Sequence, residues 1–258
     1  MPEYAKAFEE VRAQVEGPLG EELEKYPLKF AAAAFFGARP QPGTPMIVNS
    51  GSASLLRLEG QPFALTCWHV IESFRESLKK GQCIFQLANC ELDPLAQLKA
   101  QDKGLDYALI VLTEDQAKEI AKPDGPFDGT FFAEPQKWPP ADVKQGQFVA
   151  FGGFPGELRE AVSLDEISFG SFSSGASRVT SVGEDYLVCQ FEREYWIKHG
   201  YEAEPKTIRG MSGGPVFAIR HNGSGIMFHE FVGHIYEFSE NWDLLYIRLA
   251  RVVLSDAW

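Results

Sequence analysis

The chain has 258 residues, of which 45% are hydrophobic and 23% are charged, and its formal net charge is −12. Such a length and composition are those of an ordinary globular protein and exclude extensive disorder. An acidic surface repels phosphate backbones, and no run of about 18 apolar residues is present, so neither nucleic acid nor a membrane is an expected partner.

The N-terminal residues 1–28 are predicted to form a helical extension. Apolar residues recur there at helical spacing: Tyr4, Phe8, Val11 and Val15. The pattern predicts a helix over residues 3–16 that Gly17 and Pro18 end. This helix is expected to pack on the body of the protein, with binding of a regulatory protein as the alternative. Acidic residues run throughout the extension, unlike the layout of a signal peptide, which favours a cytoplasmic location.

The cysteines predict neither a metal site nor a fixed disulfide. Four are present, Cys67, Cys83, Cys90 and Cys189, with no CxxC pair and no metal-ligand spacing. Cys83 and Cys90 could form a disulfide in an oxidising compartment, whereas free buried thiols are expected in a chain without a secretion signal.

From residue 29 onward, short apolar runs broken by Gly, Pro, Asn and Asp are typical of many short antiparallel strands. In the first half these runs are Phe30–Phe36, Ser52–Leu58, Phe63–Thr66, Ile84–Leu87 and Ala108–Leu112. In the second half they are Gln147–Phe151, Ser168–Ser171, Leu187–Phe191, Val216–Ile219, Phe231–Tyr236 and Leu244–Leu249. A polar, proline-rich stretch over residues 114–142 separates the two halves. The sequence therefore predicts an all-β protein with a first domain over 29–125, a linker over 126–142 and a second domain over 143–258.

Two short motifs contain a histidine and an aspartate at the ends of predicted strands. His69 follows a strand in LTCWHV, residues 65–70, and Asp106 opens the apolar run LDYALIV, residues 105–111. Taken alone, His69 could be a surface or structural residue. Asp106 could equally be a turn or capping residue.

A third motif is more specific. Ser212 lies in RGMSGGPV, residues 209–216, where three glycines favour backbone conformations that other residues resist. A nucleophilic serine needs an exposed Oγ beside amide groups that converge on a developing oxyanion. The backbone N–H groups of Gly210 and Ser212 are the expected donors, and a plain glycine-rich turn is the alternative.

These motifs, in this order, resemble those of the trypsin-like serine peptidases, which have the chymotrypsin fold. TCWH, DYAL and GMSGGP are similar to that family's Thr-Ala-Ala-His, Asp-Ile-Ala-Leu and Gly-Asp-Ser-Gly-Gly-Pro, and His-Asp-Ser is the chain order of this fold. FVG at 231–233 and YIRL at 246–249 resemble later strands of the family. The resemblance covers residues 29–258. It implies two six-stranded antiparallel β-barrels, to which the N-terminal helix and a short C-terminal helix are added.

The resemblance also implies a function, that of a serine endopeptidase. Ser212 would attack the scissile carbonyl to form an acyl-enzyme, His69 would act as the base, and Asp106 would orient the imidazole. The substrate would be a protein or peptide, and neither a metal nor an organic cofactor would be needed. Two alternatives stay open: a catalytically silent scaffold that binds a partner protein, and a serine esterase.

Two departures from the family pattern concern activation and location. Met211 stands where digestive relatives have the aspartate that pairs with a newly cut N-terminus, and Val70 replaces a disulfide-forming cysteine. The resemblance is therefore closest to an intracellular, bacterial-style branch that needs neither proteolytic activation nor disulfides.

The substrate pocket is transferred from the family by position. Lys206 stands where tryptic relatives have the aspartate that binds basic side chains, and Thr207, Tyr236, Phe238 and Tyr246 are expected beside it. A cation among bulky aromatic residues favours cleavage after a small or apolar residue. Cleavage after an acidic residue is the alternative, because glutamate-specific relatives use a histidine nearby. His234 lies one residue out of that register, which in a strand points it to the other face.

Overall fold

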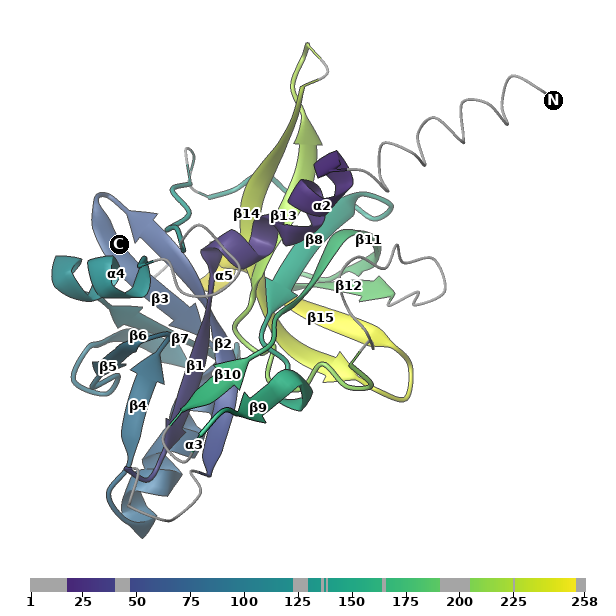
Figure 1. Cartoon of the computed structure of the whole chain (residues 1–258). Helices are drawn as coiled ribbons and strands as arrows, with labels where there is room; N and C mark the ends of the chain where they lie inside the picture. Colours follow the sequence, from purple (N-terminus) through teal and green to yellow (C-terminus); the bar gives the residue numbers. More distant parts are fainter. Residues whose placement is uncertain are drawn as a thin grey trace.

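A computed structural model describes residues 18–39, 47–122, 130–135, 137, 139–163, 166–190, 205–224 and 226–253. The predicted helix over residues 3–16 lies outside them. Two antiparallel β systems lie side by side, the N-terminal one in blue and the C-terminal one in green and yellow (Figure 1). No helix of the described residues is long and apolar enough to cross a membrane.

The first β system is a seven-stranded sheet in the order β5-β4-β1-β2-β3-β7-β6. Its strands are β1 (Ala31–Gly37), β2 (Val48–Leu58), β3 (Gln61–Thr66), β4 (Ile84–Leu87), β5 (Cys90–Leu92), β6 (Leu98–Asp102) and β7 (Tyr107–Val111). Its two helices are α3 (Trp68–Lys80) and α4 (Glu114–Ile120). Phe36, Phe74 and Phe85 pack together in its core, so that α3 is fixed against β1 and β4.

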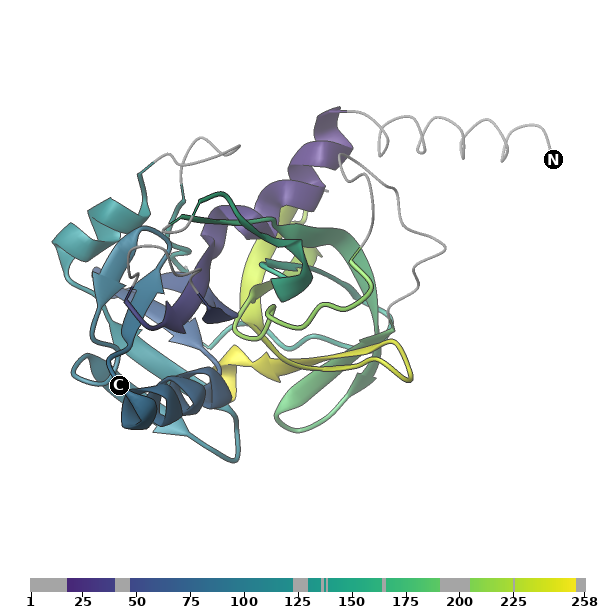
Figure 2. The same ribbon diagram turned by 60° about the horizontal axis from the view of Figure 1, so that its bottom comes forward.

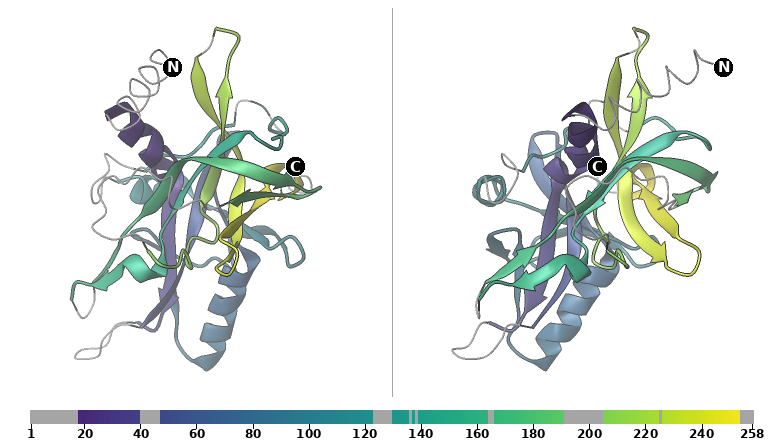
Figure 3. Two further views of the ribbon diagram at one scale, coloured as in Figure 1. Left: turned by 90° about the vertical axis from the view of Figure 1, so that its right-hand side faces the viewer. Right: turned by 45° about the vertical axis from the view of Figure 1, so that its right-hand side comes forward.

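The second β system is a closed barrel in the order β11-β12-β15-β14-β13-β8. Its strands are β8 (Phe148–Gly153), β11 (Phe172–Val182), β12 (Tyr186–Gln190), β13 (Pro215–His221), β14 (Met227–Ser239) and β15 (Leu244–Leu249). Beside it lie the 3-10 turn η2 (Gly156–Leu158) and a small ribbon of β9 (Arg159–Ala161) and β10 (Ile167–Phe169). The chain continues from β15 directly into the short helix α5 (Ala250–Val253). Figure 3 shows the β13–β14 hairpin and α3 at opposite ends of the molecule.

An N-terminal segment joins the two β systems. Helix α2 (Pro18–Lys25) packs on β11, and the 3-10 helix η1 (Tyr26–Phe30) contacts β8 and β13 before the chain enters β1 (Figure 2). The Tyr26 ring stacks on His229 with ring centroids 4.1 Å apart and meets Phe217 edge-on at 5.2 Å. These aromatic contacts bury the joint between the segment and the barrel.

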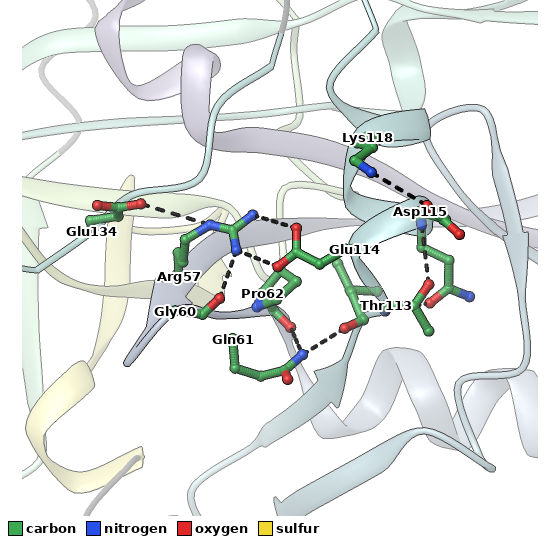
Figure 4. Close-up of polar contacts among 11 residues, drawn as sticks. Arg57, Gly60, Gln61, Pro62, Thr113, Glu114, Asp115, Lys118 and Glu134 are labelled. Atoms are coloured by element: carbon green, nitrogen blue, oxygen red, sulfur yellow. Dashed lines mark hydrogen bonds and ion pairs between the residues drawn. The ribbon is translucent and has the colours of Figure 1, made fainter.

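The connection between the halves is fixed to the first sheet at Arg57 of β2. Its guanidinium donates to Glu114 Oε1 at 2.6 Å, at the start of α4, and lies 3.7 Å from Glu134 (Figure 4). The backbone of Ala133 pairs with β2 as well, since Arg57 N–H donates to Ala133 O at 2.9 Å. Thr113 and Gln116 close a capping box that defines where α4 begins.

The predicted all-β fold class is confirmed, since the protein is built from two antiparallel β systems. The second system is a six-stranded barrel as expected, whereas the first, expected to be a six-stranded barrel, is a seven-stranded sheet with β5 and β6 at its edges. The short C-terminal helix is present as α5. All four cysteines are free thiols, Cys83 and Cys90 included.

Candidate active site

His69 lies in the first turn of α3, just beyond the end of β3. Thr66 closes β3, and Cys67 is the extended residue from which the helix begins. The apolar side chains of Val70, Ile71 and Phe74 are buried on the sheet side of the helix. This packing turns the His69 side chain outward, where 47% of it is exposed.

Asp106 holds His69 by two hydrogen bonds. It lies in the turn between β6 and β7 with φ of +52°, a left-handed conformation that aspartate tolerates better than most residues. Its Oδ1 accepts from the His69 backbone N–H at 3.0 Å, and its Oδ2 accepts from His69 Nδ1 at 2.8 Å. Burial raises the carboxyl pKa of Asp106. The bonds and charge of His69 outweigh burial, so the net pKa is lowered and the group is ionised at neutral pH.

Ser212 and His69 line the same cleft, which has a volume of about 620 Å³. Among the described residues no hydrogen bond joins the Ser212 hydroxyl to the imidazole. In structures without substrate, such catalytic contacts are often long and tighten when substrate binds.

The loop over residues 208–214, here called the 208–214 loop, has every one of its backbone carbonyl groups hydrogen-bonded. Within the loop, Met211 N–H donates to Ile208 O at 3.0 Å and Gly214 N–H donates to Met211 O at 2.8 Å. Groups outside the loop donate to the other five carbonyls: those of Arg209, Gly210, Ser212, Gly213 and Gly214.

The amide groups of this loop differ from one another. From Arg209 to Gly214, the N–H groups of four residues donate to protein acceptors: Arg209, Met211, Gly213 and Gly214. The N–H groups of Gly210 and Ser212 have no acceptor among the described residues. Backbone amides in a folded protein are nearly always paired. Because Gly210 and Ser212 line the cleft, their N–H groups can donate hydrogen bonds to a ligand bound there.

His234 lies directly behind Asp106 and away from the cleft. Its side chain is fully buried, and its Nε2–H donates to the Asp106 carbonyl oxygen at 3.5 Å, while Nδ1 has no hydrogen-bond partner. Burial lowers the pKa of His234 to about 4. In the register of β14, His234 is opposite Pro215 and Arg248, whereas the next residue, Ile235, packs inside the barrel.

This buried imidazole predicts a loss of stability in mild acid. Unfolded, His234 takes up a proton near pH 6.5, whereas the folded protein resists protonation down to about pH 4. Besides burial, the charges of Asp106, Arg248 and His69 act on the ring. Because the unfolded state binds the proton first, the free energy of unfolding should fall by roughly 2 to 3 kcal/mol between pH 7 and pH 4.5 through this group.

Urea unfolding of the wild type and of His234→Phe across that pH range measures this contribution. The difference between their free energies of unfolding should change by roughly 2 to 3 kcal/mol in favour of the variant as the pH falls. His221→Gln, which removes an exposed histidine, is the matched control variant. Parallel curves for wild type and His234→Phe would contradict the assignment.

Cys67, His69 and Asp106 offer potential metal-ligand atoms within 4.8 Å of one another. The Cys67 thiol is fully buried, however, and donates to Ile235 O at 3.3 Å. Burial raises its pKa well above the ordinary thiol value, so the thiol stays protonated. A protonated thiol beside a formed His–Asp hydrogen bond is a poor ligand set for a metal.

None of the five side chains expected in the substrate pocket lines the cleft that contains His69 and Ser212. Tyr236 packs edge-on against Tyr246 with ring centroids 6.1 Å apart, and Phe238 packs against the barrel core. The Thr207 hydroxyl donates to Glu240 at 2.6 Å. Lys206 lies at the start of the segment that leads into the 208–214 loop.

Other residues line the cleft instead, and the sequence reasoning missed them. They come from β1, β2, α3 and the 208–214 loop, and include Phe36, Asn49, Ser50, Glu72, Glu76 and Arg209. A signal for α3 was present, because Val70, Ile71, Phe74 and Leu78 follow a helical stripe. No local pattern in the sequence connects Phe36 or Asn49 with Ser212.

Comparison with known proteins identifies the family. The family model for the trypsin-like peptidase domain matches residues 47–226, well over half of the chain. The chain belongs to the trypsin-like peptidase family. The matched range contains all three motif residues: His69, Asp106 and Ser212.

A solved structure with the printed title "Structure of Glu endopeptidase in complex with MPD" is similar to this trypsin-like peptidase. The likeness covers 87% of each chain at 12% sequence identity, with a TM-score of 0.42. No curated protein matches the sequence. Membership of the family therefore rests on the match over residues 47–226 and agrees with the observed fold class.

Proposed function

We propose that this trypsin-like peptidase is a serine endopeptidase with Ser212 as nucleophile, His69 as base and Asp106 as the residue that orients the base. One observation carries the proposal: the Asp106–His69 pair, joined at 2.8 Å, opens onto the cleft that Ser212 lines. The free amides of Gly210 and Ser212 support it, because their N–H groups suit the oxyanion of a tetrahedral intermediate.

In this mechanism the imidazole of His69 carries its proton on Nδ1, which the ionised Asp106 accepts as a hydrogen bond. Nε2 is then free to take the proton of Ser212 Oγ as the oxygen attacks the scissile carbonyl. The intermediate collapses to an acyl-enzyme when His69 returns the proton to the leaving amine. Water, activated by the same imidazole, releases the acid and restores Ser212.

The substrate is proposed to be a protein or peptide, as membership of a peptidase family implies. The positions Lys206, Thr207, Tyr236, Phe238 and Tyr246 stay a proposal for the pocket that holds the side chain before the scissile bond. A cytoplasmic location is proposed as well, and the four free thiols support a reducing compartment.

A fluorophosphonate probe tests the proposal, because it forms a covalent adduct only with an activated serine. The chain starting at Met1 should be labelled on Ser212 without proteolytic trimming, since Met211 is fully buried in the barrel core and has no charge to pair with a new N-terminus. Mass spectrometry of the intact protein and of its peptides locates the adduct.

Each other outcome has a definite meaning. A folded chain that is never labelled favours the silent scaffold. Labelling only after trimming contradicts the inference from Met211. A labelled enzyme that cleaves p-nitrophenyl acetate but no member of a peptide library favours the esterase.

A further inference from the structure

The first sheet holds the 208–214 loop through two serines of β2. Ser52 N–H donates to Ser212 O at 2.8 Å, and Ser52 Oγ donates to Gly210 O at 2.9 Å. Ser54 Oγ donates to Gly213 O at 2.8 Å. All the donors are neutral groups. The loop leads into β13 of the second barrel, but three hydrogen bonds from the first sheet hold its backbone in place.

Ser52 is the centre of this arrangement. It is fully buried, and besides its two bonds to the loop its Oγ accepts from Phe154 N–H at 2.9 Å. Its carbonyl accepts from the Thr66 hydroxyl at 2.7 Å, which fixes the serine to β3. The packing is tight, since a Cβ on Gly213 would lie 2.0 Å from Ser52 O. The Ser52 hydroxyl is therefore held between one donor, Phe154 N–H, and one acceptor, Gly210 O.

Peptide geometry links this hydroxyl to the free amide of Gly210. The Arg209 carbonyl accepts from Gly156 N–H at 2.7 Å. In a planar trans peptide the next N–H points the opposite way, so Gly210 N–H is directed away from Gly156. Gly210 has φ of +100°, a conformation that glycine adopts freely, and its own carbonyl is held by Ser52 Oγ. Without that bond, the flexible glycine could rotate and withdraw its N–H.

We propose that the Ser52 hydroxyl makes Ser52 a positioning residue that keeps the amide of Gly210 aimed into the cleft. The inference rests on the proposed function, since it assigns that amide to an oxyanion. Ser52 thus holds the loop by hydrogen bonds from uncharged groups. The backbone of residues 210–214 receives no hydrogen bond from a charged side chain among the described residues.

Ser52→Ala tests this inference. The variant should lower kcat for p-nitrophenyl acetate by about 10- to 100-fold, less than the loss of an oxyanion donor itself, with KM changed by less than about threefold. The rate of fluorophosphonate labelling should fall in parallel. Ser177→Ala is the matched control, because it also removes a buried hydroxyl, one bonded to Ser174 at 3.0 Å in β11. Its kinetics should equal those of the wild type.

Hydrogen exchange supplies a readout that needs no activity. In Ser52→Ala, the amides of Met211, Gly213 and Gly214 should exchange faster than in the wild type, because their loop has lost a restraint. An unreactive wild type whose loop still loosens in the variant would overturn the proposed function and leave the positioning role standing. A reactive wild type with unchanged kcat and unchanged exchange in Ser52→Ala would overturn the positioning role.

A second variant covers the case in which Ser52→Ala does not fold. Ser52→Cys keeps nearly the size of the buried side chain and replaces the hydroxyl that donates to Gly210 O by a thiol, a weaker hydrogen-bond donor. A fall in kcat with little change in KM supports the inference, and wild-type kinetics in this variant contradict it.

Discussion

Ser212→Ala should lower kcat by about six orders of magnitude while the protein stays folded, the scale measured when the nucleophile of another serine peptidase was removed. The 208–214 loop explains why the fold should survive. Its hydrogen bonds use the Ser212 carbonyl, and the Ser212 hydroxyl has no partner among the described residues. Removing Oγ therefore deletes the nucleophile and leaves the loop intact.

The measurement is turnover of p-nitrophenyl acetate and of a peptide library, with thermal unfolding as the check of folding. Residual activity should match the background rate expected when binding and the oxyanion donors act alone. A Ser212→Ala protein with more than about a tenth of wild-type turnover would contradict the assignment of Ser212, given the loss expected for a nucleophile.

Much of the fold could be predicted because several strands, such as β1, β3, β7 and β8, are short apolar runs that are buried almost throughout. Each predicted run overlaps an observed strand, and the longest observed strand that was missed is β11 (Phe172–Val182). Its sequence, FSSGASRVTSV, contains a glycine and four serines, and it buries Ser174 and Ser177 as a hydrogen-bonded pair. Apolar periodicity cannot indicate a strand that buries hydroxyl groups.

The candidate site was predictable only in part, because some of its contacts join residues that are far apart in the sequence. His69 and Asp106 were identifiable from their motifs, and the structure brings them into contact. The support behind them was not predictable, because Ser52 and Ser212 are far apart in the sequence and meet only where the two β systems pack together. His234 likewise lies in a strand whose register alone decides that it reaches Asp106.

The packing around the residues proposed for the substrate pocket could not be predicted from their positions in the sequence. Tyr236, Tyr246 and Arg248 pack on one another, with the Arg248 guanidinium 4.3 Å from the centre of the Tyr236 ring. Arg248 also forms an ion pair with Asp185 and is buried. Such mutual packing involves side chains from two strands, β14 and β15, which a match of single positions does not specify.

Asp106→Asn should lower kcat by about four orders of magnitude, the fall measured for the same change in a chymotrypsin-fold triad. The hydrogen bonds of Asp106 give the reason. Its Oδ1 accepts from the His69 backbone N–H, so an asparagine must place its amide oxygen there and turn its NH₂ toward Nδ1. Nδ1 must then accept, which puts the ring proton on Nε2, where it blocks transfer from Ser212.

The fold should tolerate this change, because asparagine adopts the left-handed conformation of residue 106 as readily as aspartate does. Asp102→Asn is the matched control: it lies in the same hairpin, and its Oδ1 accepts from Leu105 N–H at 2.8 Å. Turnover of p-nitrophenyl acetate should fall only in Asp106→Asn. Near-normal turnover in that variant, or an equal loss in both, would mean that Asp106 does not set the tautomer of His69.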